Sequence, residues 1–311
     1  MAEQHPPLIV IVGPTGIGKT RLAVDLAQRL GGEIVSADSR QVYRGMDIGT
    51  AKPSAEERRL AAHHLIDILD PDQWLSLAEF QKMAYRAIDA IHARGRLPLL
   101  VGGTGQYVRA VVDGWGIPEV EPHHGLRADL ESYAALYGAS ALHSRLREVD
   151  PHAADAIDYR NVRRVVRALE VYLVSGEPIS RLQEQTPPPY RILQIGLTMP
   201  REALYRRVDC RVDAMIAAGW VDEMRRLLAA GYSWELPAMS SLGYPQIAAH
   251  LRGELTLEEA AAIIKRETHR FIRQQYNWFS PGDPAIHWFD VDQDPADAIA
   301  ALAAGWLVQQ A

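Results

Sequence analysis

One segment, Gly13-Pro-Thr-Gly-Ile-Gly-Lys-Thr20, restricts the fold of this chain more than any other feature of its sequence. It matches in full the pattern GxxxxGK followed by Ser or Thr. It directly follows residues 8–12, a continuous and mostly β-branched apolar run that is typical of a strand buried on both faces of a parallel sheet. A helix-like segment, residues 19–30, comes next. This order of strand, glycine-rich turn and helix predicts a phosphate-binding loop.

The chemistry of this loop suits a pyrophosphate group. Its glycines leave backbone N–H groups free to face a ligand, the N-terminus of the following helix is positive, and Lys19 and Thr20 add an ammonium group and a hydroxyl. The usual ligand of such a loop is a nucleoside triphosphate. The simpler alternative is a glycine turn beside a surface lysine. We expect a diphosphate to bind Gly13, Pro14, Thr15, Gly16, Ile17, Gly18, Lys19 and Thr20, with Thr20 also binding Mg²⁺.

One feature argues against a phosphotransferase. Such enzymes also use an acidic residue at the end of a second hydrophobic strand to position magnesium. The apolar run at residues 97–101 ends instead in Gly102-Gly-Thr-Gly-Gln-Tyr107, which contains no carboxylate. The acid at a comparable place is Asp38, which follows a short predicted strand at residues 33–36.

Strands alternate with helices over the first part of the chain. Ser76 and Glu79 have the spacing of a capping box, which predicts a helix that runs to about Ala93. The alternation predicts an α/β fold with a parallel sheet flanked by helices, and with ligands beyond the carboxyl ends of the strands. The remaining expected elements are strands at residues 191–199 and 285–291, and a long helix that a second capping box opens at Thr256.

The length of the chain, 311 residues, argues for about two domains. Linker-like composition occurs near Trp115 and again at Thr186-Pro-Pro-Pro-Tyr190, and the segment between them is rich in Ala, Leu, Arg and Glu with helical periodicity. We therefore expect a P-loop core formed by residues 1–119 and 189–311, and an inserted all-helical domain formed by residues 120–188.

Charge and cysteine content exclude several classes of protein. The chain has 33 Lys and Arg against 39 Asp and Glu, so its net charge of −6 gives no global positive field, and any site for a polyanion must be local. A single cysteine, Cys210, excludes a disulfide framework and a multi-cysteine metal site. The sequence shows neither the roughly 18 consecutive apolar residues of a membrane helix nor an export signal. We expect a cytoplasmic protein with no membrane anchor and no obligate protein partner.

Beyond the phosphate loop, several blocks of this sequence resemble the tRNA dimethylallyltransferases, also called tRNA isopentenyltransferases. The most specific block is Ser36-Ala-Asp-Ser-Arg-Gln-Val-Tyr-Arg-Gly-Met-Asp-Ile-Gly-Thr-Ala-Lys-Pro53. The other matching blocks are His63-His-Leu-Ile-Asp67, Gly102-Gly-Thr-Gly-Gln-Tyr107, Arg167-Ala-Leu-Glu170, Arg211-Val-Asp-Ala-Met215 with Gly219, and Gly243-Tyr244. The resemblance implies a P-loop kinase-like core with a helical insertion, in agreement with the elements predicted above.

The resemblance also implies a reaction. The family transfers the dimethylallyl group of dimethylallyl diphosphate to N6 of the adenosine immediately 3′ of the anticodon, in tRNAs that read codons beginning with U. The expected partners are therefore the anticodon stem-loop of tRNA and dimethylallyl diphosphate, with Mg²⁺ as cofactor. Breaking the carbon–oxygen bond puts extra negative charge on the diphosphate, which fixed donors and magnesium stabilise.

Three residues match catalytic positions of the family. Asp38 is the expected base for the exocyclic amine of adenine, a poor nucleophile that must lose a proton as the new bond forms. Thr104 is expected to donate its hydroxyl to the bridging oxygen of the donor, and Arg211 to contact the diphosphate. Without the resemblance, Asp38 fits more readily a turn aspartate that accepts backbone N–H groups.

Contacts with tRNA are implied in both predicted domains, because the adenine must leave the anticodon-loop stack and be read through its edges. In the core they fall on Asp38, Ser39, Arg40, Gln41 and Thr104, and on Arg273 and Gln274 of the last long helix. That helix, residues 268–279, is less basic than the family pattern, which weakens a position-by-position match.

In the insertion the implied tRNA contacts are Arg127, Arg163, Arg164 and Arg167. Arg160, Arg163, Arg164 and Arg167 have the spacing i, i+3, i+4 and i+7. One helical face is therefore expected to carry all four. Four arginines on one face suit a phosphate backbone. The alternative is a solvated face whose arginines pair with Asp155, Asp158 and Glu170.

Three other functions fit parts of the sequence. A small-molecule kinase would use ATP at the same loop, and an adenylate isopentenyltransferase would prenylate free adenine nucleotides, although such enzymes lack or reduce the helical insertion. A non-catalytic RNA-binding protein would be expected to have lost the phosphate loop or Asp38, and both are intact. The adjacent His63 and His64 are expected to pack or cap rather than to bind a metal ion.

Overall fold

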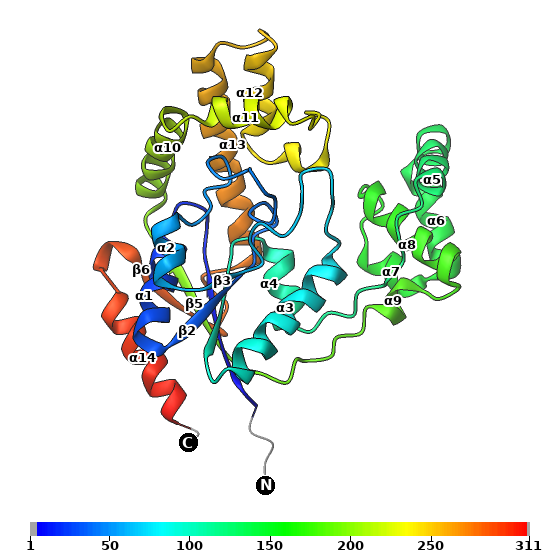
Figure 1. The fold of residues 1–311 in the computed structure, drawn as a ribbon. Helices are drawn as coiled ribbons and strands as arrows, with labels where there is room; N and C mark the ends of the chain where they lie inside the picture. The colour runs from blue at the N-terminus through cyan, green and yellow to red at the C-terminus, as the bar shows by residue number, and fades with distance from the viewer. Residues whose placement is uncertain (1–4, 310–311) are drawn as a thin grey trace. The chain divides into compact units, whose positions relative to one another are not determined.

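The computed structural model describes residues 5–309 and contains a six-stranded sheet in which all pairings are parallel (Figure 1). The strand order is β3-β2-β4-β1-β5-β6. In chain order the strands are β1 (Pro7–Val12), β2 (Gly32–Ser36), β3 (His63–His64), β4 (Leu97–Val101), β5 (Arg191–Thr198) and β6 (Ile286–Asp290). The predicted α/β fold with a parallel sheet is confirmed, and each predicted strand begins and ends within one residue of the observed one.

The short edge strand β3 has no counterpart among the predicted strands. It pairs His63 and His64 with Ile34 and Val35 of β2. Two residues without an apolar run carry no strand signal of their own, so only the pairing with β2 defines this strand. Both rings have protein partners, since His63 Nδ1 lies 2.8 Å from the Ala61 carbonyl oxygen and His64 Nε2 lies 2.7 Å from Glu33 Oε2.

Nine helices and two 3-10 turns surround the sheet in the described residues of its unit. They are α1 (Lys19–Leu30), α2 (Ala55–Leu60), α3 (Leu77–Ala93), α4 (Gly105–Val112), α10 (Arg201–Ala217), α11 (Trp220–Ala229), η1 (Pro237–Ser240), α12 (Tyr244–Leu251), α13 (Leu257–Trp278), η2 (Val291–Gln293) and α14 (Ala296–Val308). The predicted capping boxes at Ser76 and Thr256 open α3 and α13. No described helix is both long and apolar enough to cross a membrane.

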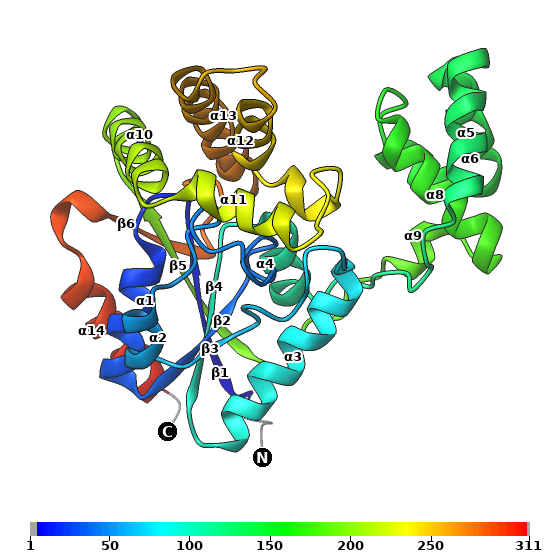
Figure 2. The same cartoon turned by 45° about the horizontal axis from the view of Figure 1, so that its top comes forward.

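Two apolar layers cover the two faces of the sheet. On one face Ile9 and Ile11 of β1 pack in a cluster with residues of α1 and α14, and on the other Leu8 and Val10 pack with residues of α3 and α4. This alternation along β1 is the period of two that a strand buried on both faces requires. Figure 2 shows helices α10–α13 beyond the ends of the strands, on the side where the loops after β1, β2 and β4 lie.

A second compact unit consists of residues 113–188, and the first consists of the chain up to Val112 and from Pro189 on. The helices of the second unit are α5 (His124–Tyr137), α6 (Ala139–Val149), α7 (Pro151–Ala156), α8 (Val162–Ser175) and α9 (Ile179–Leu182). It has its own apolar core, which includes Leu142, Leu146 and Val165. The second unit begins seven residues before the predicted start at residue 120. Backbone hydrogen bonds join Gly114 to Thr186 and Gly116 to Glu184, and so tie the beginning of this unit to its end.

Candidate active site

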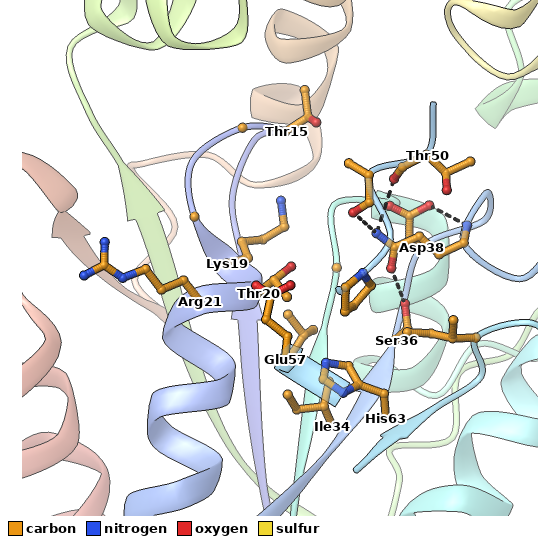
Figure 3. Close-up of a pocket in the computed structure, with 18 of the residues that line it drawn as sticks. Thr15, Lys19, Thr20, Arg21, Ile34, Ser36, Asp38, Thr50, Glu57 and His63 are labelled. Atoms are coloured by element: carbon orange, nitrogen blue, oxygen red, sulfur yellow. Dashed lines mark hydrogen bonds between the residues drawn. The ribbon is translucent and has the colours of Figure 1, made fainter. Parts of the chain in front are cut away.

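A cavity of about 450 Å³ opens where the loops after β1, β2 and β4 converge, as expected for the carboxyl ends of parallel strands (Figure 3). Residues 13–20, which we call the phosphate loop, form one wall with Thr15, Gly16, Gly18, Lys19 and Thr20. Asp38 and Thr50 lie across the cavity from Lys19 and Thr20 in Figure 3. The structure thus brings the predicted diphosphate site and the predicted base to one cavity.

The phosphate loop takes the conformation that its glycines allow. Gly16 and Gly18 have φ values of 78° and 104°, in the left-handed region that favours glycine. The Lys19 ammonium donates to the carbonyl oxygens of Gly13 and Pro14, both at 2.9 Å. Of the eight residues predicted to bind diphosphate, Gly13, Pro14 and Ile17 do not line the cavity, and Ile17 is buried in the apolar core.

The environment of the Lys19 ammonium group favours the binding of an anion. Burial lowers the pKa of its ammonium group to about 8, with the positive charge of Arg211 adding to the shift and the carboxylate of Asp38 opposing it. A diphosphate beside Lys19 would bring negative charge next to the buried ammonium group and so stabilise its charged form. The cavity therefore has a cation whose charge a bound anion would stabilise.

Asp38 combines the two roles weighed from the sequence. Its Oδ1 accepts the backbone N–H of Arg40 at 2.8 Å and that of Gln41 at 3.4 Å, which is the turn role. The side chain also lines the cavity, where Figure 3 shows it facing the phosphate loop. The turn fixes the orientation of the carboxylate and leaves Oδ2 out of these two hydrogen bonds.

Thr104 lies next to Asp38 but outside the lining of the cavity. Its Oγ1 accepts the backbone N–H of Ser39 at 3.1 Å and donates to Ser39 Oγ at 3.5 Å. This contact joins the turn after β4 to the loop after β2. The long second distance describes a weak bond, so the hydroxyl proton remains available for a ligand oxygen.

The side chain of Gln41 has internal partners at both ends. Its Oε1 accepts the hydroxyl of Ser36 at 3.2 Å, and its Nε2 faces the carbonyl oxygens of Thr50 and Ala51 at 3.4 and 3.3 Å. These bonds hold the residue 50–51 loop as a wall of the cavity. The predicted tRNA contacts of Arg40 and Gln41 stay predictions. The guanidinium group of Arg40 donates to the Pro237 carbonyl oxygen at 3.3 Å.

The cavity contains functional groups that sequence reasoning missed. Arg207 lines it one helical turn before Arg211 on α10, and Ser36 of β2, Glu57 of α2 and His63 of β3 also line it. Two of them had a signal in the sequence. Arg207 precedes Arg211 at the i, i+4 spacing of one helix face, and Ser54 and Glu57 form a capping box that opens α2.

The two predicted contact residues of α13, Arg273 and Gln274, are exposed, and Arg273 donates to the Tyr205 hydroxyl at 3.1 Å. The next residue, Gln275, is buried and bonds to the phosphate loop and to the turn after β4. Sequence analysis did not single it out. Arg273 and Gln274 therefore lie on the exposed side of α13, and Gln275 lies on the side that faces the site.

In the second unit, the arginines of the insertion divide into two pairs. Arg127 and Arg167 hold the fully buried Glu170, with nitrogen–oxygen distances of 2.7–2.8 Å. Burial favours the neutral acid, but these hydrogen bonds outweigh it and lower the pKa of Glu170 to about 2. Arg163 and Arg164 are exposed on α8. The tRNA contacts of all four arginines stay predictions. Arg127 and Arg167 also have a structural role, because both bind Glu170.

The expectation that one helical face carries Arg160 with the other three is wrong. Asn161 caps α8 by accepting the N–H of Arg164, so the helix begins at Val162. Arg160 lies before the cap and pairs with Asp158. The alternative pairing is therefore found for Asp158 and Glu170, whereas Asp155 pairs with Arg147.

Comparison with known proteins gives a consistent result. The family model described as IPP transferase matches residues 41–281, and that described as isopentenyl transferase matches residues 6–67. A tRNA dimethylallyltransferase of Chloroflexus aggregans is 61% identical over 272 residues, which cover 88% of this chain and 92% of the relative.

Solved structures agree with the sequence relatives. The crystal structure of a full-length tRNA isopentenylpyrophosphate transferase from Bacillus halodurans is 43% identical, covers 96% of both chains and has a TM-score of 0.71. A eukaryotic dimethylallyltransferase acting on tRNA is 27% identical, with a TM-score of 0.81 over 96% of this chain and 77% of that one. Because a family model spans most of the sequence and a close relative covers nearly all of it, this chain belongs to the IPP transferase family.

Proposed function

We propose that this protein transfers the dimethylallyl group of dimethylallyl diphosphate to N6 of the adenosine immediately 3′ of the anticodon in tRNAs that read codons beginning with U. One observation carries the proposal: the phosphate loop and the carboxylate of Asp38 line the same cavity. The loop suits the diphosphate of the donor, and a carboxylate across from it suits the amine of the acceptor. The names of the relatives, tRNA dimethylallyltransferases, support this substrate pair.

The residues around the cavity fit a magnesium ion. Mg²⁺ prefers oxygen ligands and usually combines one or two protein oxygens with waters and substrate phosphates. The cavity offers the hydroxyl of Thr20 and the carboxylates of Asp38 and Glu57. Thr20, at the end of the phosphate loop, would hold the ion against the diphosphate, where the ion would supply positive charge for the leaving group.

The reaction requires one bond to break and one to form. The carbon–oxygen bond of dimethylallyl diphosphate breaks, and its electron pair leaves with the diphosphate. In this proposal Lys19 and Arg211, which line the cavity, and the loop amides stabilise that charge, and the hydroxyl of Thr104, which lies just outside the lining, donates to the bridging oxygen. The lone pair of N6 forms the new carbon–nitrogen bond, and the proton released from N6 passes to the carboxylate of Asp38.

Features of the site favour this reaction over phosphoryl transfer by a small-molecule kinase. The turn after β4 continues from Val101 into Gly102 and Gly103, so the strand end next to β1 brings no carboxylate for a nucleotide-bound magnesium ion. In addition, the chain carries a separate helical unit of residues 113–188 with its own core. An enzyme that prenylates only free nucleotides has no need of such a unit.

Transfer of labelled dimethylallyl diphosphate tests the proposal. The purified protein is incubated with Mg²⁺ and one of three acceptors, namely an anticodon stem-loop with adenosine after the anticodon, the same loop with guanosine there, or free AMP. Label on the adenosine loop alone is the expected result. Label on AMP would indicate an adenylate isopentenyltransferase, and ATP turnover with no labelled acceptor would indicate a kinase.

A further inference from the structure

The side chain of Gln275 connects two separate parts of the active site. Gln275 lies on α13 and is only 4% exposed. Its Oε1 accepts the backbone N–H of Thr15 in the phosphate loop at 2.8 Å, and its Nε2 donates to the carbonyl oxygen of Gly103 at 3.0 Å. Gly103 immediately precedes Thr104. One amide group therefore links the loop expected to hold the diphosphate with the turn that carries the expected donor to its bridging oxygen.

The chemistry of the two partners fixes the orientation of this amide. A backbone N–H can only donate, so Oε1 must face Thr15, and a carbonyl oxygen can only accept, so Nε2 must face Gly103. Among side chains of this length, only glutamine or a protonated glutamate provides an acceptor and a donor on the same planar group. Leucine has nearly the same size and provides neither, which makes it the matched apolar substitution.

The turn after β4 is shaped to receive the end of α13. A Cβ atom on Gly103 would lie 2.4 Å from Gln275 Nε2, and one on Gly105 would lie 2.1 Å from the ring of Trp278. Such distances are shorter than real Cβ contacts, so a side chain at Gly105 would displace Trp278, and one at Gly103 would push the amide group of Gln275 away from the turn. The two glycines thus explain how α13 places a buried amide beside Thr104.

We propose that Gln275 is a positioning residue that sets the spacing between the phosphate loop and the Thr104 turn. The inference rests on the proposed function, because it takes the cavity as the site of the donor diphosphate. When the donor binds, the phosphate loop and Thr104 must contact oxygens of the same diphosphate group. A buried hydrogen-bonded link between them keeps both in register before the ligand arrives, which lowers the cost of organising the site.

The first test replaces Gln275 with leucine. Gln275→Leu removes both bonds and leaves the Thr15 N–H and the Gly103 carbonyl without this partner. We expect the dissociation constant for inorganic pyrophosphate with Mg²⁺ to rise about tenfold, and kcat for prenyl transfer to fall about 10- to 100-fold. Affinity for the anticodon stem-loop should stay within about twofold. Asn277→Ala, at an exposed position of the same helix, is the control and should match the wild type.

The second test replaces Gln275 with glutamate and varies the pH. In the Gln275→Glu variant, both hydrogen bonds form only while the new carboxyl group carries its proton, since the ionised form cannot donate to the Gly103 carbonyl oxygen. The ratio of variant to wild-type pyrophosphate affinity should therefore be near one at about pH 5.5 and fall as the pH rises to about 8.5. A merely structural role would weaken stem-loop binding in parallel.

These measurements separate the inference from the proposed function. Wild-type pyrophosphate affinity in the Gln275→Leu variant, or a pH-independent ratio for Gln275→Glu, would overturn the positioning role. If the wild-type protein bound pyrophosphate but transferred no prenyl group to any acceptor, the proposed function would fail, whereas the binding experiments would still decide the role of Gln275.

Discussion

At the scale of single residues, the turn and the catalytic roles of Asp38 support each other. A carboxylate that must accept a proton from a weak nucleophile needs a fixed orientation, and the N–H groups of Arg40 and Gln41 provide it through Oδ1. The same geometry explains why the sequence alone favoured a turn aspartate. A turn at the carboxyl end of a strand is one way to hold a functional side chain at the mouth of a cavity.

The substitution Asp38→Asn separates the two roles. The amide oxygen of asparagine still accepts the N–H of Arg40, so the turn should persist, but the side chain no longer takes a proton. We expect kcat for transfer to the stem-loop to fall about 10²- to 10⁴-fold, with stem-loop affinity within about twofold of wild type. Filter binding and single-turnover transfer measure the two quantities. Full transfer activity in the variant would contradict the assignment of Asp38 as base.

Lys19 gives the site a pH dependence of defined sign. Its pKa of about 8 in the folded protein lies below the ordinary 10.5, so the ammonium loses its proton as the pH rises through 8. Only the charged form attracts a diphosphate, so the ratio of wild-type to Lys19→Met affinity for pyrophosphate should be constant below about pH 7 and decline above about pH 8. Calorimetry with Lys19→Met reports the titration of pyrophosphate itself. A wild-type to variant affinity ratio that does not change up to about pH 9.5 would count against this expectation.

At the scale of elements, a buried carboxylate holds the loop between Met46 and Lys52 in place. Glu223 of α11 is 1% exposed and accepts the N–H groups of Asp47 and Ile48 at 2.7 and 2.6 Å, that of Gly49 at 3.1 Å, and the Tyr244 hydroxyl at 2.7 Å. Burial, followed by the charge of Glu223, raises the pKa of Tyr244. The motif Gly243-Tyr244, quoted above only as a family match, thus has a structural role.

Removal of this carboxylate should be costly. Glu223→Ala leaves three backbone N–H groups and the hydroxyl of the buried Tyr244 without this acceptor, so we expect a loss of about 3 kcal/mol in the free energy of unfolding. Tyr244→Phe removes one of the four bonds and should cost about 1 kcal/mol. Urea unfolding measures both. Asp222→Ala, which removes a neighbouring exposed carboxylate on the same helix, is the control and should change stability by less than about 0.5 kcal/mol.

At the scale of the whole molecule, a chain with a net charge of −6 must bind RNA through local groups of cations. The second unit shows how folding selects among them. Glu170 forms ion pairs with Arg127 and Arg167. The adjacent residues Arg163 and Arg164 of α8 are exposed. The exposed pair has the greater freedom to contact phosphates, and the other pair has the greater effect on the stability of the unit.

Salt dependence distinguishes the two pairs. Log affinity for the anticodon stem-loop falls as log salt concentration rises. In the double variant Arg163→Ala with Arg164→Ala this slope should be shallower by about 1.5, because each lost phosphate contact removes about 0.7 to 0.9 from its steepness. Thermal stability should change little. Arg147→Ala with Arg181→Ala removes the same charge from arginines that are already ion paired, and should leave the slope nearly unchanged. Equal slopes for both double variants would contradict a phosphate contact of Arg163 and Arg164.

Much of what depends on neighbouring residues could be predicted from the sequence, although the cap of α8 at Asn161 and the capping box of α2 at Ser54 were not. The phosphate loop, α1, the capping boxes of α3 and α13, and five of the six strands follow from spacing, because propensity, capping and burial periodicity act over a few positions. The strand β3 was missed because two histidines have no periodicity. The composition marks the linker near Trp115, but it does not show that Gly114 pairs with Thr186 and so belongs to the second unit.

Local patterns in the sequence therefore predict the parallel α/β core and the phosphate loop, whereas Asp38 is expected to be the base only through the family resemblance. The tertiary structure decided which distant side chains complete the site. Thr15 and Gln275 are 260 positions apart and Gly103 and Gln275 are 172 apart. Helical spacing from Ile272 and Phe279 puts Gln275 on the buried side of α13, but it does not identify the partners of its amide group. Burial against a particular partner is a property of the packed chain, since it depends on which faces of the elements meet and not on the residues beside them.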